Sequence, residues 1–147
     1  MINLHEGKTS INNNGYGHSL NEAPIKHDNF KFRTLYETYF HDALKERGLC
    51  FSPLPVFTYA GKRVEPDFLV LINGSCLFIE LDGSSHCETM LQAERRLKFL
   101  KQNLAEVYRI EVPSNADLDW ARSEVKKVES HIQKTLYSAI GRVVKCL

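Results

Sequence analysis

The chain has 147 residues, of which 43% are hydrophobic and 25% are charged, and its formal net charge is +1. This is enough for one domain with a hydrophobic core and too little for a second domain of ordinary size. Because no apolar run approaches the roughly 20 residues that span a bilayer, and because no secretory pattern opens the chain, we expect a cytoplasmic protein without a membrane partner.

The first thirty residues show little apolar periodicity and contain the run NNNGYG at positions 12–17. We therefore predict a flexible N-terminal extension over 1–30 and a single domain over 31–147. The domain begins with an amphipathic helix that ends at Gly48 and is capped by Asp28 or Asn29. The buried stripe of this helix consists of Phe32, Leu35, Tyr36, Tyr39, Phe40, Ala43 and Leu44.

Strand signals follow the first helix. The segment from Pro53 to Tyr59 predicts an edge strand limited by its prolines, and Gly61-Lys62 turns the chain into a second strand. The runs 64–72 and 75–81 are rich in Val, Ile, Leu and Phe, and Asn73-Gly74 between them is a strong signal for a type I′ hairpin turn.

This hairpin carries four acids at informative positions. If Asn73 and Gly74 form the loop, opposed positions add up to 147, so Asp67 lies across from Glu80. Glu65 then lies across from Asp82, and all four acids share one face because side chains alternate sides along a strand. Phe68, Val70, Ile72, Leu77, Ile79 and Leu81 fill the other face.

The acidic face has two interpretations. Like charges opposed on a sheet destabilise it, and a hard cation such as Mg²⁺ or Mn²⁺ would remove the repulsion. Alternatively the face is solvated, since acids are common on exposed edges. A three-residue loop through Ser75 would shift the register by one and place Asp67 opposite Leu81, which would break the acidic pairing.

The motif Pro66-Asp67, twelve intervening residues, and Glu80-Leu81-Asp82 resembles the core signature of the PD-(D/E)XK nuclease superfamily. The string IELDGSSH at 79–86 is similar to endonuclease-like families related to the very-short-patch repair endonucleases, and the resemblance covers about residues 32 to 112. It implies a restriction-endonuclease-like three-layer α/β/α core with a mixed central sheet. It also implies a metal held by Asp67, Glu80 and the Leu81 backbone carbonyl.

The chain departs from that superfamily at Asp82, which occupies the position of a lysine that stabilises charge on the phosphate or helps to position the attacking water. Asp82 belongs to the candidate catalytic set but cannot act as a cation. The candidates for the missing cation are His86, Arg96 and Lys98. Related families with ELDG-type motifs carry the same aspartate, so the change alone does not imply inactivity.

Several candidates also have an ordinary structural interpretation. Lys98 forms a favourable i,i+4 surface pair with Glu94. His86 either reaches the carboxylates from a flexible loop or starts the next helix. Glu37 matches a glutamate that approaches the metal in the superfamily, or it is a boundary residue beside the buried stripe of the first helix.

The four cysteines, at positions 50, 76, 87 and 146, form no CxxC pair. This spacing argues against a structural zinc site built from thiolates. We interpret Cys50 and Cys76 as reduced packing residues.

The remaining chain predicts a helix after the motif, a strand over Val107 to Val112, and a last helix from Asp117 to about Leu136. The element order is then helix, three strands, helix, strand, helix. This order suits an α/β fold with helices on both faces of a mixed sheet. The helix after the motif has a buried stripe formed by Met90, Ala93, Leu97, Leu100 and Leu104.

We expect a metal-dependent endonuclease that hydrolyses DNA phosphodiester bonds with Mg²⁺ or Mn²⁺, with RNA as an alternative substrate. A net charge near zero is not typical of a DNA-binding protein, but Lys and Arg are concentrated at 95–101 and 126–145. The alternative function is a catalytically inactive nucleic-acid- or protein-binding subunit on the same fold, within a larger defence, repair or mobile-element assembly. A homodimer or a partner subunit is compatible with both.

Overall fold

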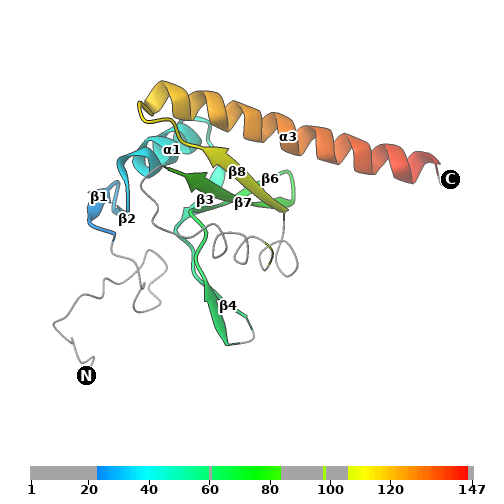
Figure 1. The fold of residues 1–147 in the computed structure, drawn as a ribbon. Helices are drawn as coiled ribbons and strands as arrows, with labels where there is room; N and C mark the ends of the chain where they lie inside the picture. The colour runs from blue at the N-terminus through cyan, green and yellow to red at the C-terminus, as the bar shows by residue number, and fades with distance from the viewer. Residues whose placement is uncertain (1–22, 60, 84–97, 99–105, 146–147) are drawn as a thin grey trace.

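The protein is described by a computed structural model, which covers residues 23–59, 61–83, 98 and 106–145 (Figure 1). The elements are eight strands and two helices within those ranges. The strands are β1 (Ile25–His27), β2 (Phe30–Phe32), β3 (Cys50–Pro53), β4 (Phe57–Tyr59), β5 (Lys62–Val64), β6 (Phe68–Ile72), β7 (Ser75–Asp82) and β8 (Glu106–Glu111), and the helices are α1 (Leu35–Glu46) and α3 (Leu118–Lys145).

The central sheet has the strand order β3-β6-β7-β8. The β3–β6 and β6–β7 pairs are antiparallel and the β7–β8 pair is parallel, so the sheet is mixed, as predicted. The register of the β6–β7 hairpin is also confirmed, because Phe68 pairs with Ile79 and Ile72 with Ser75. Both loop residues have positive φ, 50° at Asn73 and 79° at Gly74, as a type I′ turn requires.

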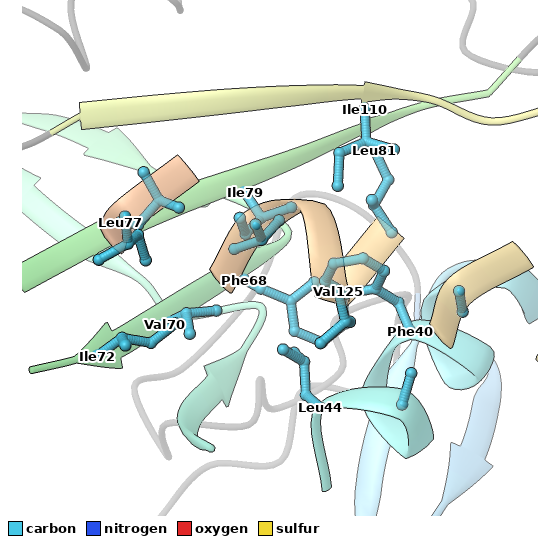
Figure 2. Packing of buried hydrophobic residues seen from close by; sticks show 14 of the residues in the cluster. Phe40, Leu44, Phe68, Val70, Ile72, Leu77, Ile79, Leu81, Ile110 and Val125 are labelled. Carbon is cyan, nitrogen blue, oxygen red and sulfur yellow. The ribbon is translucent and has the colours of Figure 1, made fainter. Parts of the chain in front are cut away.

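The hydrophobic core lies between one face of this sheet and the two helices. Figure 2 shows Phe40 and Leu44 of α1 and Val125 of α3 against the side chains of β6 and β7. The helices also pack against each other, and in Figure 1 α3 extends beyond the sheet at its C-terminal end. The core residues that β6 and β7 contribute are those that alternation assigned to the apolar face: Phe68, Val70, Ile72, Leu77, Ile79 and Leu81.

The structure is therefore α/β, with both described helices against the same core. The helix predicted after the motif lies outside the described residues except for Lys98, which is helical. The three-layer arrangement with helices on both faces stays a prediction. No helix within the described ranges is long and apolar enough to cross a membrane.

The start of the domain differs from the prediction. Asp28 and Asn29 do not cap α1 but form the two-residue turn of the β1–β2 hairpin, with φ of 50° and 65°. Their short polar side chains tolerate this left-handed conformation, which explains the turn. The helix is capped instead by Thr34, and Phe32 belongs to β2. Residues 23–30 are thus part of the folded chain, and the boundary predicted at residue 30 was placed too late.

The strands before the hairpin also differ from the prediction. β3 is an edge strand of the central sheet, and it stops at Pro53 because Leu54 adopts a φ of 45°. Among the described strands, β4 and β5 pair only with each other, and Figure 1 shows their hairpin extending away from the sheet. Cys50 and Cys76 are exposed and are not the packing residues that we expected.

The last helix is longer than predicted and continues to Lys145. Asp117 precedes it and its Oδ1 accepts a hydrogen bond from the backbone N–H of Trp120. No proline follows Pro113 in the sequence, so no proline interrupts the helix near Leu136.

Candidate functional site

The β6–β7 hairpin brings Asp67 to Glu80. Asp67 directly precedes β6, and continuing the observed register by one residue places it across from Glu80 on β7. The Asp67 Oδ2 accepts a hydrogen bond of 2.7 Å from the backbone N–H of Leu81, which immediately follows Glu80. The predicted juxtaposition of these two acids is therefore present in the fold.

These two carboxylates are buried rather than solvated. Asp67 is 3% exposed and Glu80 is 1% exposed. The alternative of an open acidic surface does not hold for them, although Asp82 at the end of β7 is partly exposed. Because an ionised carboxylate loses several kcal/mol of hydration on burial, such a group needs positive charge or hydrogen-bond donors nearby.

Arg33 supplies positive charge at this point, and sequence reasoning missed it. Its Nη2 forms an ion pair with Glu65 Oε1 at 2.8 Å, although the two groups are not aligned for a hydrogen bond. Its Nη1 lies 3.4 Å from Asp67 Oδ1. The side chains of Arg33 and Glu65 are about one-tenth exposed. Arg33 lies in the chain between β2 and Thr34, the N-cap of α1, so this connection brings its charge to the residues before β6.

Glu37 lies at the start of α1 and is fully buried. It completes a capping box with Thr34, and its Oε2 accepts hydrogen bonds from the backbone N–H groups of Arg33 and Thr34 at 2.7 and 3.3 Å. Its Oε1 is buried with no hydrogen-bond partner among the described residues. Glu37 is therefore both part of the α1 cap and a carboxylate beside Asp67, and its role near a metal stays a prediction.

Burial raises the pKa of Glu37 from 4.5 to about 7, and the negative charge of Asp67 adds to this shift. The backbone hydrogen bonds from Arg33 and Thr34 and the charge of Arg33 act in the opposite direction without cancelling it. A carboxyl group with this pKa exchanges its proton near neutral pH. Such pKa shifts are frequent in functional sites, although structural networks also produce them.

Asp82, in the position of the superfamily lysine, is held at the surface. Its Oδ2 accepts a hydrogen bond from Nε of Arg109 on β8, whose side chain is 45% exposed. Arg109 is aligned with Glu80 in the parallel β7–β8 register. It lies 27 residues after Asp82 in the chain, so nothing in the sequence indicated that it would meet the motif. The structure thus pairs Asp82 with a cation and does not bring it into the buried carboxylate group.

The other predicted residues are placed only in part. His86 and Arg96 lie outside the described residues, and Lys98 has an exposed side chain. Leu81 is 1% exposed and contacts the site through its backbone N–H, while the role of its carbonyl stays a prediction.

The C-terminal helix carries a basic surface. A hollow of about 480 Å³ lies between β8 and α3 and includes Lys126, Lys127 and Lys134 in its wall, with Tyr108 and His131 beside them. Lys127 also forms an ion pair with Glu124. The hollow concentrates cationic side chains on one side of a protein whose formal net charge is only +1.

The donor set at Asp67 and Glu80 suits a hard cation. Mg²⁺ is commonly held by one or two carboxylates and completes its octahedron with water and substrate phosphate. Within the described residues, three side-chain ligand atoms that all lie within 4.8 Å of one another occur at His27, His41 and Asp42 and not among these acids. The acids therefore fit an open two-carboxylate site rather than a closed cage of protein ligands.

Comparisons with known proteins leave the family open. No protein-family model matches the chain, and no curated protein matches it. A solved structure titled "Crystal Structure of Protein of Unknown Function AF1548" is similar, with 13% sequence identity and a TM-score of 0.39. The match covers 65% of this chain and 55% of that chain, so it spans about half the length of the similar protein.

Proposed function

We propose that this protein is a metal-dependent endonuclease of the PD-(D/E)XK type that hydrolyses DNA phosphodiester bonds. The observation that carries the proposal is the burial of Asp67 and Glu80 at adjoining positions of one hairpin, beside the buried Glu37. Burying acids costs stability, a cost that proteins carry at functional sites, and the sequence motif resembles that of nucleases at the same residues.

Asp67 and Glu80, with the Leu81 carbonyl, would hold Mg²⁺ or Mn²⁺. Such an ion supplies an activated water and neutralises charge on the phosphate. The chain orients Asp67 through the hydrogen bond from the Leu81 N–H. The Arg33 Nη1 lies 3.4 Å from the Asp67 Oδ1, which is longer than a strong hydrogen bond.

Glu37 would accept a proton near the carboxylates. Its Oε2 is held by two backbone donors, whereas its Oε1 has no hydrogen-bond partner among the described residues. With a pKa of about 7, the carboxyl group holds a proton below neutral pH and releases it above. Those are the properties of a general base that works at neutral pH.

Among the described residues, Arg33 is a candidate for the role of the superfamily lysine, which Asp82 cannot fill because it carries no positive charge. Its guanidinium lies at Asp67 and is only about one-tenth exposed, so its charge is weakly screened. The planar fork of arginine binds phosphate through two parallel hydrogen bonds. His86, Arg96 and Lys98 remain further candidates for the same role.

The basic hollow between β8 and α3 supports a nucleic acid as the substrate. Lys126, Lys127 and Lys134 are exposed, as phosphate-contacting lysines are. They would contact the phosphate backbone without reading sequence, because phosphate contacts carry no base information.

The test is a cleavage panel of supercoiled, linear, single-stranded and branched DNA, with a single-stranded RNA, in Mg²⁺, Mn²⁺ or EDTA. Wild type is compared with Glu80→Gln, which keeps the side-chain shape, and with Glu111→Gln, an exposed acid on the neighbouring strand. We expect metal-dependent cutting by wild type and Glu111→Gln and none by Glu80→Gln. Equal cutting by all three proteins would overturn the assignment of this site.

The second candidate is a catalytically inactive binding module on the same fold. The ion pair between Asp82 and Arg109 favours it, because the motif position that carries a catalytic lysine in the superfamily here holds an acid paired with an arginine of the neighbouring strand. This function predicts DNA or partner binding that is unchanged by EDTA, with no cutting under any condition of the panel.

A further inference from the structure

A second group of ligand-type residues lies where the β1–β2 hairpin meets α1, one helical turn after Glu37. His27 on β1 and His41 and Asp42 on α1 each offer one ligand atom, and all three atoms lie within 4.8 Å of one another. His27 Nε2 is 2.6 Å from Asp42 Oδ1. This group shares no residue with the carboxylates at Asp67 and Glu80.

His41 is the buried member of the group, with 1% exposure. Its Nε2 lies 3.0 Å from Asp28 Oδ2, which also accepts from the Lys45 ammonium. Because a carboxylate accepts hydrogen bonds and does not donate them, this contact assigns the ring proton to Nε2. The other ring nitrogen, Nδ1, is buried and has no hydrogen-bond partner among the described residues.

A buried imidazole nitrogen without a donor is a costly feature in a core. The rings of Phe30, Phe32 and Phe51 pack around His41 with centroids 5.1 to 5.4 Å away, so these neighbours offer Nδ1 no hydrogen-bond donor. In metalloproteins, a ligating histidine usually donates its second ring N–H to a carboxylate, which fixes its orientation. The Asp28–His41 pair has that arrangement.

We propose that His27, His41 and Asp42 form a binding site for a zinc-type transition metal ion, with His41 as a ligand through Nδ1 and Asp28 as the carboxylate that orients it. Two imidazoles and one carboxylate are a donor set that suits Zn²⁺ and is too soft for Mg²⁺. The site thereby differs in metal preference from the acids at the β6–β7 hairpin.

The cluster is open to solvent, so an ion can reach it. His27 and Asp42 are 38% and 33% exposed, and a hollow of about 350 Å³ includes His27 and Asp28 in its wall. Zn–N and Zn–O bonds of about 2.0–2.2 Å separate tetrahedral ligand atoms by roughly 3.3 Å, within the present spacing of the group. The ion would replace the hydrogen bond between His27 and Asp42, and water would complete its coordination.

A metal here would join the β1–β2 hairpin to α1. His41 lies one helical turn after Glu37, and β2 leads directly into Arg33. Holding the hairpin against the helix therefore restrains both ends of the segment that carries Arg33 and the cap of α1. The metal has a structural role in this proposal, and no substrate needs to contact it.

The test is Zn²⁺ titration by calorimetry at pH 7 on the full chain, comparing wild type with His27→Ala. The matched control is His131→Ala, because His131 pairs with Glu106 at the same 2.6 Å and has 36% exposure. All three proteins keep their cysteines, so binding by thiols is equal in them. We expect one strong equivalent in wild type and His131→Ala, and at least about tenfold weaker binding in His27→Ala.

Histidine side-chain NMR on ¹⁵N-labelled protein gives a second readout that does not depend on folding differences between variants. Zn²⁺ should shift the Nδ1 resonance of His41 while its Nε2 stays protonated, and Mg²⁺ should shift neither. Equal Zn²⁺ affinity in His27→Ala and wild type, or His41 resonances unmoved by one equivalent of Zn²⁺, would overturn the proposal.

Discussion

The β6–β7 and β1–β2 hairpins are built on the same kind of turn but carry different chemistry. Each has a two-residue loop with positive φ at both positions, Asn73-Gly74 in one and Asp28-Asn29 in the other. The first brings carboxylates to Glu37 of α1, and the second brings an imidazole to His41 one turn further along the same helix.

The comparison shows how α1 can serve two sites. Residues four apart lie on the same side of a helix, so Glu37 and His41 both face the folded domain and are both buried. Carboxylates gather at one position, and two imidazoles with one carboxylate gather at the other. If both proposals hold, the helix separates a hard-cation site from a zinc-type site by a single turn.

The largest expected effect concerns the carboxylate hairpin. Asp67→Asn should lower the rate of DNA cleavage by about 10³-fold or more, because a metal ion contributes several kcal/mol of charge stabilisation. Single-turnover cleavage with Mn²⁺ measures it. The control is Asp119→Asn, whose side chain is 85% exposed, and circular dichroism establishes that both variants are folded. Undiminished cleavage by Asp67→Asn would remove this hairpin from the active site.

Removal of Arg33 should destabilise the same hairpin. Arg33→Met leaves Glu65 and Asp67 without a guanidinium that is about one-tenth exposed, and we expect a loss of about 3–5 kcal/mol in the free energy of unfolding. Urea denaturation measures the loss. Arg47→Met, which removes an exposed pair with Glu129, should cost less than about 1 kcal/mol. Similar losses in the two variants would show that Arg33 does not neutralise buried charge.

The raised pKa of Glu37 predicts that the free energy of unfolding depends on pH. Its pKa is raised from 4.5 to about 7, so protonation favours the folded state, and the stabilisation is complete below about pH 4.5 and lost as the pH rises through 7. At 1.36 kcal/mol per pKa unit the change is about 3 kcal/mol. Glu37→Gln should lack this dependence in urea denaturation between pH 4.5 and 8. Parallel pH profiles for wild type and variant would contradict the pKa shift.

The smallest expected change in unfolding free energy comes from substitutions in the two turns, which can be compared directly. Gly74→Ala places a side chain at a φ of 79° and should cost about 1–2 kcal/mol in thermal or urea unfolding. Asn29→Gly relaxes the equivalent position of the other hairpin and should change stability by only a few tenths of a kcal/mol. Equal effects would mean that the turns do not hold the hairpins in register.

The carboxylate hairpin could be predicted from sequence because its signals are local. Asn73-Gly74 sets the register, and alternation along the strands then assigns Phe68 to the core and Asp67 to the other face. The β1–β2 hairpin was missed because Asp and Asn favour both helix caps and left-handed turns, and the choice between these depends on Thr34. Thr34 and Glu37 have capping-box spacing, which is a signal that could have located the true start of α1.

The partners of the buried acids could not be predicted in the same way. Arg33 meets Glu65 and Asp67 only after the chain has folded through α1 and three strands, and no periodicity links residues so far apart. The His27–His41 contact joins a strand to a helix in the same manner. Such contacts depend on tertiary packing, and the pattern of a single chain does not contain them.

The most direct test of two chemically distinct sites is Mn²⁺ binding measured by electron paramagnetic resonance, in wild type, Asp67→Asn and His27→Ala. Free Mn²⁺ gives a six-line signal that is reduced when the ion binds. We predict that wild type and His27→Ala bind Mn²⁺ equally and that Asp67→Asn binds it at least about tenfold more weakly. Loss of Mn²⁺ binding in His27→Ala, with retention in Asp67→Asn, would contradict the account.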